Sequence, residues 1–350
     1  MTILVINLLL TKHLYSMIKS NYLISEKEMN LISTTILRKK PVLLQGIPRL
    51  IARLPPDHRK VQYLQKQLYR IGAGYSGECN VDSYIERTQF PHIMKIFTDV
   101  HLCNSPKFTF QIDTLIITEQ YILIIEVKNL KDSVRFIPNP PHLVQVLETG
   151  DEVVLDCPVY QIESNKSNLD EWLRQRGIHL KTLGLLILAN PNTKVIDTPD
   201  NFPIIYKKQI PFYLQKLRPT EDILTPQQIQ ELSRQIHAEQ QQFNPFPLCT
   251  YYHIHPDDLR KGLLCHDCHG QLKRKNRETW HCPHCLKVAV DPHNDAIQDW
   301  LILVKPSLNN KDCRNFLMLK DKYAASYALN KSPLMKKGKS TSTFYIAGRK

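Results

Sequence analysis

Residues 110–129 read FQIDTLIITEQYILIIEVKN, and this stretch decides the fold. Its apolar side chains fall into two alternating sets: Leu115, Ile117, Ile122 and Ile124 in one, and Ile116, Leu123, Ile125 and Val127 in the other. Strands that are apolar on both faces lie at the centre of a sheet that is covered on both sides. The stretch therefore predicts two central strands, Phe108–Thr118 and Tyr121–Asn129, in an α/β fold with helices on both faces.

A two-residue turn at Glu119-Gln120 would join these strands as an antiparallel hairpin. Residues opposite each other then have numbers that sum to 239, so Asp113 lies opposite Glu126. Opposed side chains share a face with Cβ atoms roughly 5 Å apart, and Lys128 shares that face because it lies two residues beyond Glu126. Glu-Gln is a poor turn sequence, so a longer turn with another register is the alternative.

Two carboxylates at that separation cannot both stay ionised comfortably without a cation. Mg²⁺ (or Mn²⁺) would supply one, bound by Asp113 and Glu126. A neighbouring Lys128 can orient or help to deprotonate a metal-bound water and balance charge that develops on a phosphate. The alternative is that Glu126 and Lys128 are ordinary charges at the end of a strand.

The surrounding sequence, from about residue 71 to residue 196, has a mixed α/β pattern. Gly72, Gly74 and Gly77 precede a predicted helix at Glu78–Arg87, which leads to a strand at about Met94–Leu102. The elements expected after the hairpin are strands at 143–147, 152–155 and 183–188, a helix from Pro158 to Arg176 capped by Asp156, and a helix from Thr225-Pro226 to about residue 242.

Four short segments resemble the NERD (nuclease-related domain) family, a branch of the PD-(D/E)XK restriction-endonuclease-like group. They occur in the family's order within residues 72–180 and are Gly74-Tyr75-Ser76-Gly77-Glu78, Gln111-Ile112-Asp113, Glu126-Val127-Lys128-Asn129 and Pro158-Val159-Tyr160-Gln161. The resemblance implies a restriction-endonuclease-like mixed sheet flanked by helices.

The resemblance also implies a role for each matching residue. Asp113 and Glu126 would bind Mg²⁺ with the Val127 carbonyl nearby, and Lys128 would position the attacking water. Glu78 would complete the acidic site from the first helix, and Gln161 would reach in from the later helix.

Two of these positions have an alternative explanation, and one neighbouring position departs from the family pattern. A carboxylate such as Glu78 is favoured near a helix N-terminus by the helix dipole, and an exposed helical Gln161 needs no function. Cys157 stands where the family more often has Asn, which puts in doubt how the helix that follows is capped.

The cysteines point to a metal rather than to disulfides. Cys265/Cys268 and Cys282/Cys285 form two Cys-x-x-Cys pairs with thirteen residues between them. In a reducing compartment this spacing predicts a four-thiolate zinc ribbon, in which the zinc folds a module too small to bury enough core. Four nearby histidines could replace a thiolate: His266, His269, His281 and His284.

Positive charge is concentrated in the last third of the chain. The formal net charge is +13, while residues 305–350 hold 11 basic and 2 acidic side chains and residues 260–287 hold 7 and 2. The remaining residues are together about neutral, so a polyanion, usually nucleic acid, is the expected partner of these two segments. The candidate contacts are Lys273, Arg274, Lys275, Arg277, Lys336, Lys337 and Lys339. A solvated basic tail is the alternative for the last twenty residues.

The C-terminal pattern predicts three helices, Asp295–Val304, Asn310–Lys320 and Asp321–Leu329, followed by a basic turn and a strand at Ser342–Ile346. A winged helix-turn-helix has this order, and its third helix would enter the major groove of DNA. A helical cap packed on the nuclease-like domain is the alternative.

These patterns divide the chain into five parts: an N-terminal helical segment (1–70), a NERD nuclease-like domain (71–243), a linker marked by Pro245 and Pro247 (244–260), the zinc ribbon (261–290) and a basic helical or winged-helix module (291–350). The apolar run Ile3–Leu10 is too short to span a bilayer and lacks the charged residues and cleavage site of a signal peptide. We expect a cytoplasmic protein without a membrane partner. Met17 and Met29 are alternative translation starts to Met1.

The predicted function is that of a Mg²⁺-dependent nuclease that hydrolyses DNA phosphodiester bonds and grips DNA through its ribbon and basic module. The alternative is a non-catalytic DNA-binding or regulatory protein that retains the nuclease-like scaffold. RNA is not excluded as the substrate.

Overall fold

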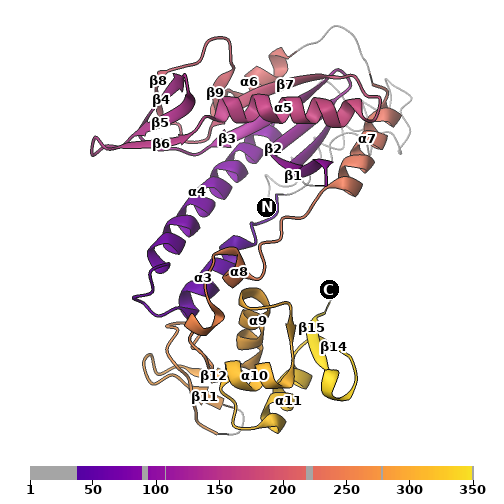
Figure 1. Cartoon of the computed structure of the whole chain (residues 1–350). Helices are drawn as coiled ribbons and strands as arrows, with labels where there is room; N and C mark the ends of the chain where they lie inside the picture. Colours follow the sequence, from indigo (N-terminus) through magenta and orange to yellow (C-terminus); the bar gives the residue numbers. More distant parts are fainter. Residues whose placement is uncertain (1–37, 89–93, 107, 218–223, 277–278, 349–350) are drawn as a thin grey trace, which may run out of the picture. The chain divides into compact units, whose positions relative to one another are not determined.

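The computed structural model describes residues 38–88, 94–106, 108–217, 224–276 and 279–348 (Figure 1). It divides into two compact units. The first, here called the sheet unit, comprises residues 74–242 together with Arg38 and Lys39. The second, here called the C-terminal unit, joins residues 40–73 to residues 243–350.

A five-stranded mixed sheet forms the centre of the sheet unit, with the strand order β1-β2-β3-β7-β9. Its strands are β1 (Met94–Ser105), β2 (Phe108–Thr118), β3 (Tyr121–Lys128), β7 (Lys181–Leu188) and β9 (Ile204–Tyr206). The first three are antiparallel, whereas β7 runs parallel to β3 and β9 runs parallel to β7. The two central strands expected from the sequence are β2 and β3.

The hairpin between β2 and β3 has the predicted register. The paired residues run from Thr114↔Ile125 to Ile117↔Ile122, so each pair sums to 239. Both alternating sets of apolar side chains are buried, one on each face of the sheet. The apolar alternation and the two-residue turn therefore specify this pairing, as expected.

Helices cover both faces of the sheet. One face packs against α5 (Pro158–Arg174), which crosses it in Figure 1, and against α7 (Pro226–Glu239). The other face packs against α4 (Val61–Glu86) and α6 (Ile210–Lys216), the latter following a short 3-10 helix at Lys207–Gln209.

A second, four-stranded sheet with the order β6-β5-β4-β8 also packs against α5. Its strands are β4 (Ser133–Pro138), β5 (Pro141–Val146), β6 (Glu152–Asp156) and β8 (Lys194–Asp197). Val134, Phe136 and Leu143 from this sheet join the same apolar core as α5. The sequence predicted β5 and β6, but it did not reveal β4 and β8.

Two helix starts differ from the prediction. Helix α4 begins at Val61 rather than at Glu78 and continues through all three glycines. At Gly77 the helix lies close against the end of β3, where an added Cβ would be 2.6 Å from the Cβ of Asn129. Helix α5 is capped by Cys157 rather than by Asp156, and the Cys157 side chain makes no capping hydrogen bond.

The C-terminal unit is built around one apolar core. Its helices are α3 (Leu43–Arg53), the first half of α4, α8 (Leu248–Tyr251), α9 (His293–Leu303), α10 (Asn310–Leu317), α11 (Lys322–Lys331), and short 3-10 helices at Pro256–Asp258 and Ser340–Ser342. Its strands are β10 (Lys273–Arg274), β11 (Thr279–His281) and β12 (Val288–Val290) in the ribbon, and β13 (Ser307–Leu308), β14 (Leu334–Lys337) and β15 (Phe344–Ala347) near the C-terminus.

This core joins parts that the sequence suggested were separate. The expected linker, residues 244–260, contains α8 and buries Leu248, Tyr252 and Leu259 in the same core as α3 and α9. The Arg53 side chain, 1% exposed, forms an ion pair with Asp299 at 2.8 Å and thereby ties α3 to α9. Residues 40–73 therefore fold with the C-terminal third of the chain and not as part of an independent N-terminal segment. Residues 1–37 of that expected segment lie outside the described residues.

The last part of the C-terminal unit has the element order α9-β13-α10-α11-β14-β15. Its three strands form a sheet with the order β13-β15-β14, in which each neighbouring pair is antiparallel. The sequence predicted the three helices and the last strand, but it did not reveal β13 or β14.

No helix within the described residues is long and apolar enough to cross a membrane.

The close approach of α4 to β3 leads to a test of the fold. We expect Gly77→Ala to lower the free energy of unfolding by about 1–3 kcal/mol, because the new methyl group overlaps Asn129. Gly74→Ala is the matched control: its Cβ would meet only Glu78 Oε1, at 3.9 Å, so it should be neutral or stabilising by up to about 1 kcal/mol. Urea denaturation followed by circular dichroism measures both. Equal stability of the two variants would contradict the close packing of α4 on β3.

Candidate active site

The five residues predicted to form a catalytic site come together in the sheet unit from four elements. Asp113 lies on β2, Glu126 and Lys128 on β3, Glu78 on α4, and Gln161 on α5. The three carboxylates are close enough that the charge of Asp113 raises the pKa of both glutamates. The site therefore forms where β3 ends between a helix on each face of the sheet.

Asp113 is held by the backbone of the neighbouring strand. The regular backbone pairing of β2 with β3 ends at the pair Thr114↔Ile125. Beyond that point the Val127 N–H donates to Asp113 Oδ2 at 2.9 Å. The Asp113 carboxylate thus takes the place of a ladder hydrogen bond, which fixes it beside Glu126.

Glu126, Lys128 and Gln161 form a hydrogen-bonded chain. Lys128 Nζ donates to Glu126 Oε1 at 2.7 Å and to Gln161 Oε1 at 3.2 Å. The Glu126 side chain is 3% exposed, whereas Lys128 remains 27% exposed. Burial is the largest single influence and lowers the pKa of Lys128, but the charge of Glu126, its hydrogen bond to Lys128 and the charge of Asp113 together raise the pKa above its usual value. The raised pKa favours the ammonium form of Lys128, which donates both hydrogen bonds.

Burial also controls the charge of the two glutamates. It is the largest cause that raises the pKa of Glu78 and of Glu126 to about 7, and the Asp113 charge adds to it in both cases. Burial likewise raises the pKa of Asp113. Ionised carboxylates in this position need positive charge nearby, and a set of carboxylate oxygens suits a hard divalent cation such as Mg²⁺ or Mn²⁺.

Two further charged residues adjoin the site, and sequence reasoning missed both. Arg38 Nη1 donates to Glu78 Oε2 at 2.8 Å, although 40 residues separate them and no local pattern links them. Asp99 lies on β1 between the pairs Thr98↔Thr114 and Val100↔Ile112, opposite Asp113. Its charge raises the pKa of Asp113. No register was predicted for the β1–β2 pair; its observed register places Asp99 opposite Asp113.

Asp99 has its own hydrogen-bond partners. Its backbone φ is +53°, in the left-handed region, where Asp is one of the residues that tolerates this conformation. Its Oδ1 lies 3.0 Å from His101 Nε2 and accepts from Gln111 Nε2 at 2.8 Å. The hydrogen bond with His101 lowers the pKa of Asp99, so this carboxylate stays ionised beside the site.

Except for Arg38, the residues of the candidate site lie within one segment that matches a family model. Residues 73–189 match the family model of the NERD nuclease-related domain. The match confirms the resemblance inferred from four short motifs, and it includes Glu78, Asp113, Glu126, Lys128 and Gln161. The NERD segment starts within α4 and ends one residue after β7. No curated protein and no solved structure matched the chain.

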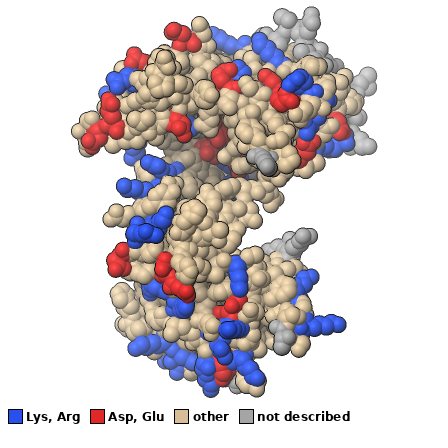
Figure 2. Space-filling model, viewed as in Figure 1, with Lys and Arg blue, Asp and Glu red and all other residues tan. Residues whose placement is uncertain are grey.

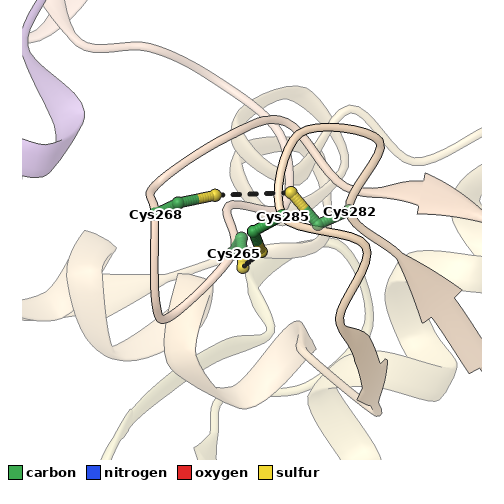
Figure 3. A group of neighbouring side chains, drawn as sticks. All are labelled: Cys265, Cys268, Cys282 and Cys285. Atoms are coloured by element: carbon green, nitrogen blue, oxygen red, sulfur yellow. Dashed lines mark hydrogen bonds between the residues drawn. The ribbon is translucent and has the colours of Figure 1, made fainter.

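A second cluster, in the C-terminal unit, consists of the four cysteines of the two Cys-x-x-Cys pairs. Figure 3 shows their sulfur atoms turned toward one another from two turns of the ribbon. All four lie within 4.8 Å of one another, with Cys268 Sγ 3.4 Å from Cys282 Sγ and Cys265 Sγ 3.6 Å from Cys285 Sγ. Four thiolates bound tetrahedrally to zinc at ~2.3 Å lie roughly 3.8 Å apart. The cluster could therefore hold a structural zinc ion with little movement.

The remaining candidate ligands do not join this cluster. Within the described residues, the group at metal-binding distance consists of the cysteines alone, without the four neighbouring histidines. The Cys285 backbone N–H is the largest influence that lowers the pKa of the Cys282 thiol to about 6, whereas hydrogen bonds among the thiols raise the pKa of Cys268 to about 12. The proton is therefore shared unevenly among the four sulfur atoms.

The basic candidates for nucleic-acid contact are exposed. Lys273 and Arg274 form the ribbon strand β10 and Lys275 follows it, while Lys336 and Lys337 lie on β14 and Lys339 follows the turn. Arg277 lies outside the described residues. Figure 2 shows Lys and Arg side chains gathered over the lower part of the view, where β11, β12, α10 and α11 are drawn in Figure 1.

The raised pKa of Glu126 gives a pH dependence of stability. The folded value of about 7 exceeds the ordinary 4.5, so the native state holds this proton at pH values where the unfolded chain has released it. Without divalent cations, the wild type should lose up to about 3 kcal/mol of stability relative to Glu126→Gln as the pH rises from about 4.5 to about 7.

Urea denaturation of both proteins between pH 4.5 and 8 tests this expectation. Glu163→Gln, an exposed position on α5, is the control and should follow the wild type at every pH. Parallel curves for the wild type and Glu126→Gln would contradict a proton held at Glu126.

The cysteine cluster gives a second test. We expect one zinc ion per chain, lost in Cys282→Ser but retained in Cys103→Ser, because Cys103 lies on β1 and outside the cluster. Zinc loss should lower the melting temperature of the C-terminal unit, since the metal and the ribbon fold together. Metal analysis and scanning calorimetry measure the two effects. Equal zinc content in both variants would show that the cluster does not hold the metal.

Proposed function

We propose that this protein is a divalent-metal-dependent nuclease that hydrolyses phosphodiester bonds of DNA. The observation that carries the proposal is the group of Asp113, Glu126 and Lys128 at the end of β3, inside the segment that matches the NERD family. Two buried carboxylates beside a protonated lysine suit a reaction in which negative charge develops on a phosphate.

In the proposed site, Asp113 and Glu126 would hold Mg²⁺ or Mn²⁺, because a cation offsets the repulsion between two buried carboxylates. When bound, such a cation supplies positive charge to the phosphodiester and lowers the pKa of a water molecule. The Lys128 ammonium would donate a hydrogen bond to the attacking water and offset charge on the phosphate. Gln161 accepts a hydrogen bond from Lys128, so we assign it to holding Lys128 in place. Glu78 would add negative charge from the α4 side.

The C-terminal unit would bind the DNA. Its exposed lysines and arginines can neutralise phosphates, and the order α9-β13-α10-α11-β14-β15 supports a winged-helix arrangement. In that arrangement α11 would enter the major groove, and the turn between β14 and β15, with Lys337 and Lys339, would contact the backbone. Tyr323 and Tyr327 are exposed on α11, one turn apart, and could contact bases there.

A non-catalytic DNA-binding protein is the second candidate. The excess positive charge lies outside the NERD segment, in residues 260–287 and 305–350. Binding could therefore persist without cleavage. A cytoplasmic location and a role without membranes remain our expectation for either function.

A cleavage assay distinguishes the two candidates. We expect the purified chain to cut labelled DNA with Mg²⁺ or Mn²⁺ and not with EDTA. Glu126→Gln should lower the rate by at least about 100-fold, since a ligand of the cation is lost, while the affinity for DNA changes little. Single-stranded DNA, double-stranded DNA and RNA of one sequence serve as parallel substrates.

The matched control is Glu163→Gln, which alters the charge of the same unit away from the site and should cleave like the wild type. Salt-sensitive binding without cleavage, alike in the wild type and Glu126→Gln, would overturn the nuclease and support the binding protein. Cleavage of RNA but of neither DNA would show that the substrate is RNA.

A further inference from the structure

Arg38 is the most heavily bonded charged side chain beside the candidate active site, and it lies outside the segment that matches the NERD family. Its side chain is only 3% exposed. Nε and Nη2 donate to the two carboxylate oxygens of Asp82 at 2.7 and 3.1 Å, and Nη1 donates to Glu78 Oε2 at 2.8 Å. Nη2 also donates to the Asp113 carbonyl at 2.9 Å and to Thr114 Oγ1 at 2.7 Å.

These hydrogen bonds join the helix to the strand that carries Asp113. Glu78 and Asp82 lie four residues apart and therefore face the same side of α4. The planar guanidinium can bond to both carboxylates in fixed directions, which a lysine ammonium cannot do. Its bonds to Asp113 and Thr114 then set the position of α4 against β2.

The contact also distinguishes the two oxygens of Glu78. Oε2 accepts from Arg38, whereas Oε1 makes no hydrogen bond to any residue that the structure describes. The same guanidinium bonds to the Asp113 carbonyl, so the Glu78 carboxylate is held beside one of the two proposed metal ligands. An oxygen that is held beside Asp113 and makes no hydrogen bond within the described residues can contribute to binding a cation, directly or through water.

We propose that Arg38 is a positioning residue of the cation site: it holds Glu78 by one oxygen and leaves the other to the cation. This inference rests on the proposed function only in placing a divalent cation at Asp113 and Glu126. It does not require that the protein cleave DNA.

The sign of the effect separates positioning from simple charge. Loss of a nearby positive charge would by itself strengthen cation binding, because less repulsion opposes the ion. Loss of positioning would weaken binding, by about 10- to 100-fold for residues that orient metal ligands. Arg38→Lys keeps the charge but loses the planar fork, so positioning predicts weaker binding in this variant as well.

The experiment measures Mn²⁺ binding to the zinc-loaded full-length chain by electron paramagnetic resonance, with circular dichroism to confirm folding. The Mn²⁺ site is defined as the one that Glu126→Gln abolishes. We expect Arg38→Gln and Arg38→Lys to weaken this site by about 10- to 100-fold. In a Glu78→Gln background, Arg38→Lys should have little further effect, because the two residues act through one contact.

Arg176→Gln is the matched control. Arg176 also lies in the sheet unit, where it pairs with Glu239 and stacks on Trp172. Its loss should cost stability without changing Mn²⁺ affinity.

Three results would overturn the proposal: unchanged affinity in a folded Arg38→Lys chain, tighter binding in both Arg38 variants, or an equal loss with and without Glu78. Cleavage reports separately on the proposed function. Mn²⁺ binding that depends on Arg38 in a chain that does not cut DNA would sustain the positioning role and refute the nuclease. The lack of any Mn²⁺ site sensitive to Glu126→Gln would refute both.

Discussion

Repulsion among buried carboxylates is the constraint on which the rest of the sheet unit depends. Glu78, Asp113 and Glu126 come from three different elements. Burial raises the pKa of each; the charge of Asp113 adds to this effect at the two glutamates, and the charge of Asp99 adds to it at Asp113. Such a group is unfavourable unless cations offset it. The fold supplies two, Lys128 beside Glu126 and Arg38 beside Glu78. Groups whose pKa values are perturbed in this way are typical of functional sites, and the NERD match agrees with that interpretation.

The scaffold holds these side chains on rigid elements. Gly77 allows α4 to lie directly against the end of β3. On the other face, Asn165 of α5 donates to the Gln111 carbonyl of β2 at 2.7 Å, and Gln161 accepts from Lys128. Sites whose supporting shell is fixed by packing and hydrogen bonds keep their geometry. The sheet is apolar on both faces, and the burial of these side chains supplies the stability that offsets the cost of keeping the charged group together.

The two units differ in charge and in how they are stabilised. The sheet unit buries its carboxylates beneath helices on both faces, whereas the C-terminal unit combines an apolar core, the buried Arg53–Asp299 ion pair and a cluster of four thiols. The excess positive charge lies in the C-terminal unit, so a division between chemistry in one unit and phosphate binding in the other is physically consistent. Helix α4 contributes residues to both units.

The sequence by itself determined the central strands, their register, the two buried faces, the NERD resemblance and the spacing of the cysteines. These features follow from local periodicity and short motifs, which are encoded in neighbouring residues. Only the tertiary structure decided that α4 starts at Val61, that residues 40–73 fold with the ribbon, and that Arg38 and Asp99 adjoin the carboxylates. Arg38 meets the Asp113 carbonyl across 75 residues of chain. Such contacts leave no local pattern, because they depend on how distant elements pack and not on the residues beside them.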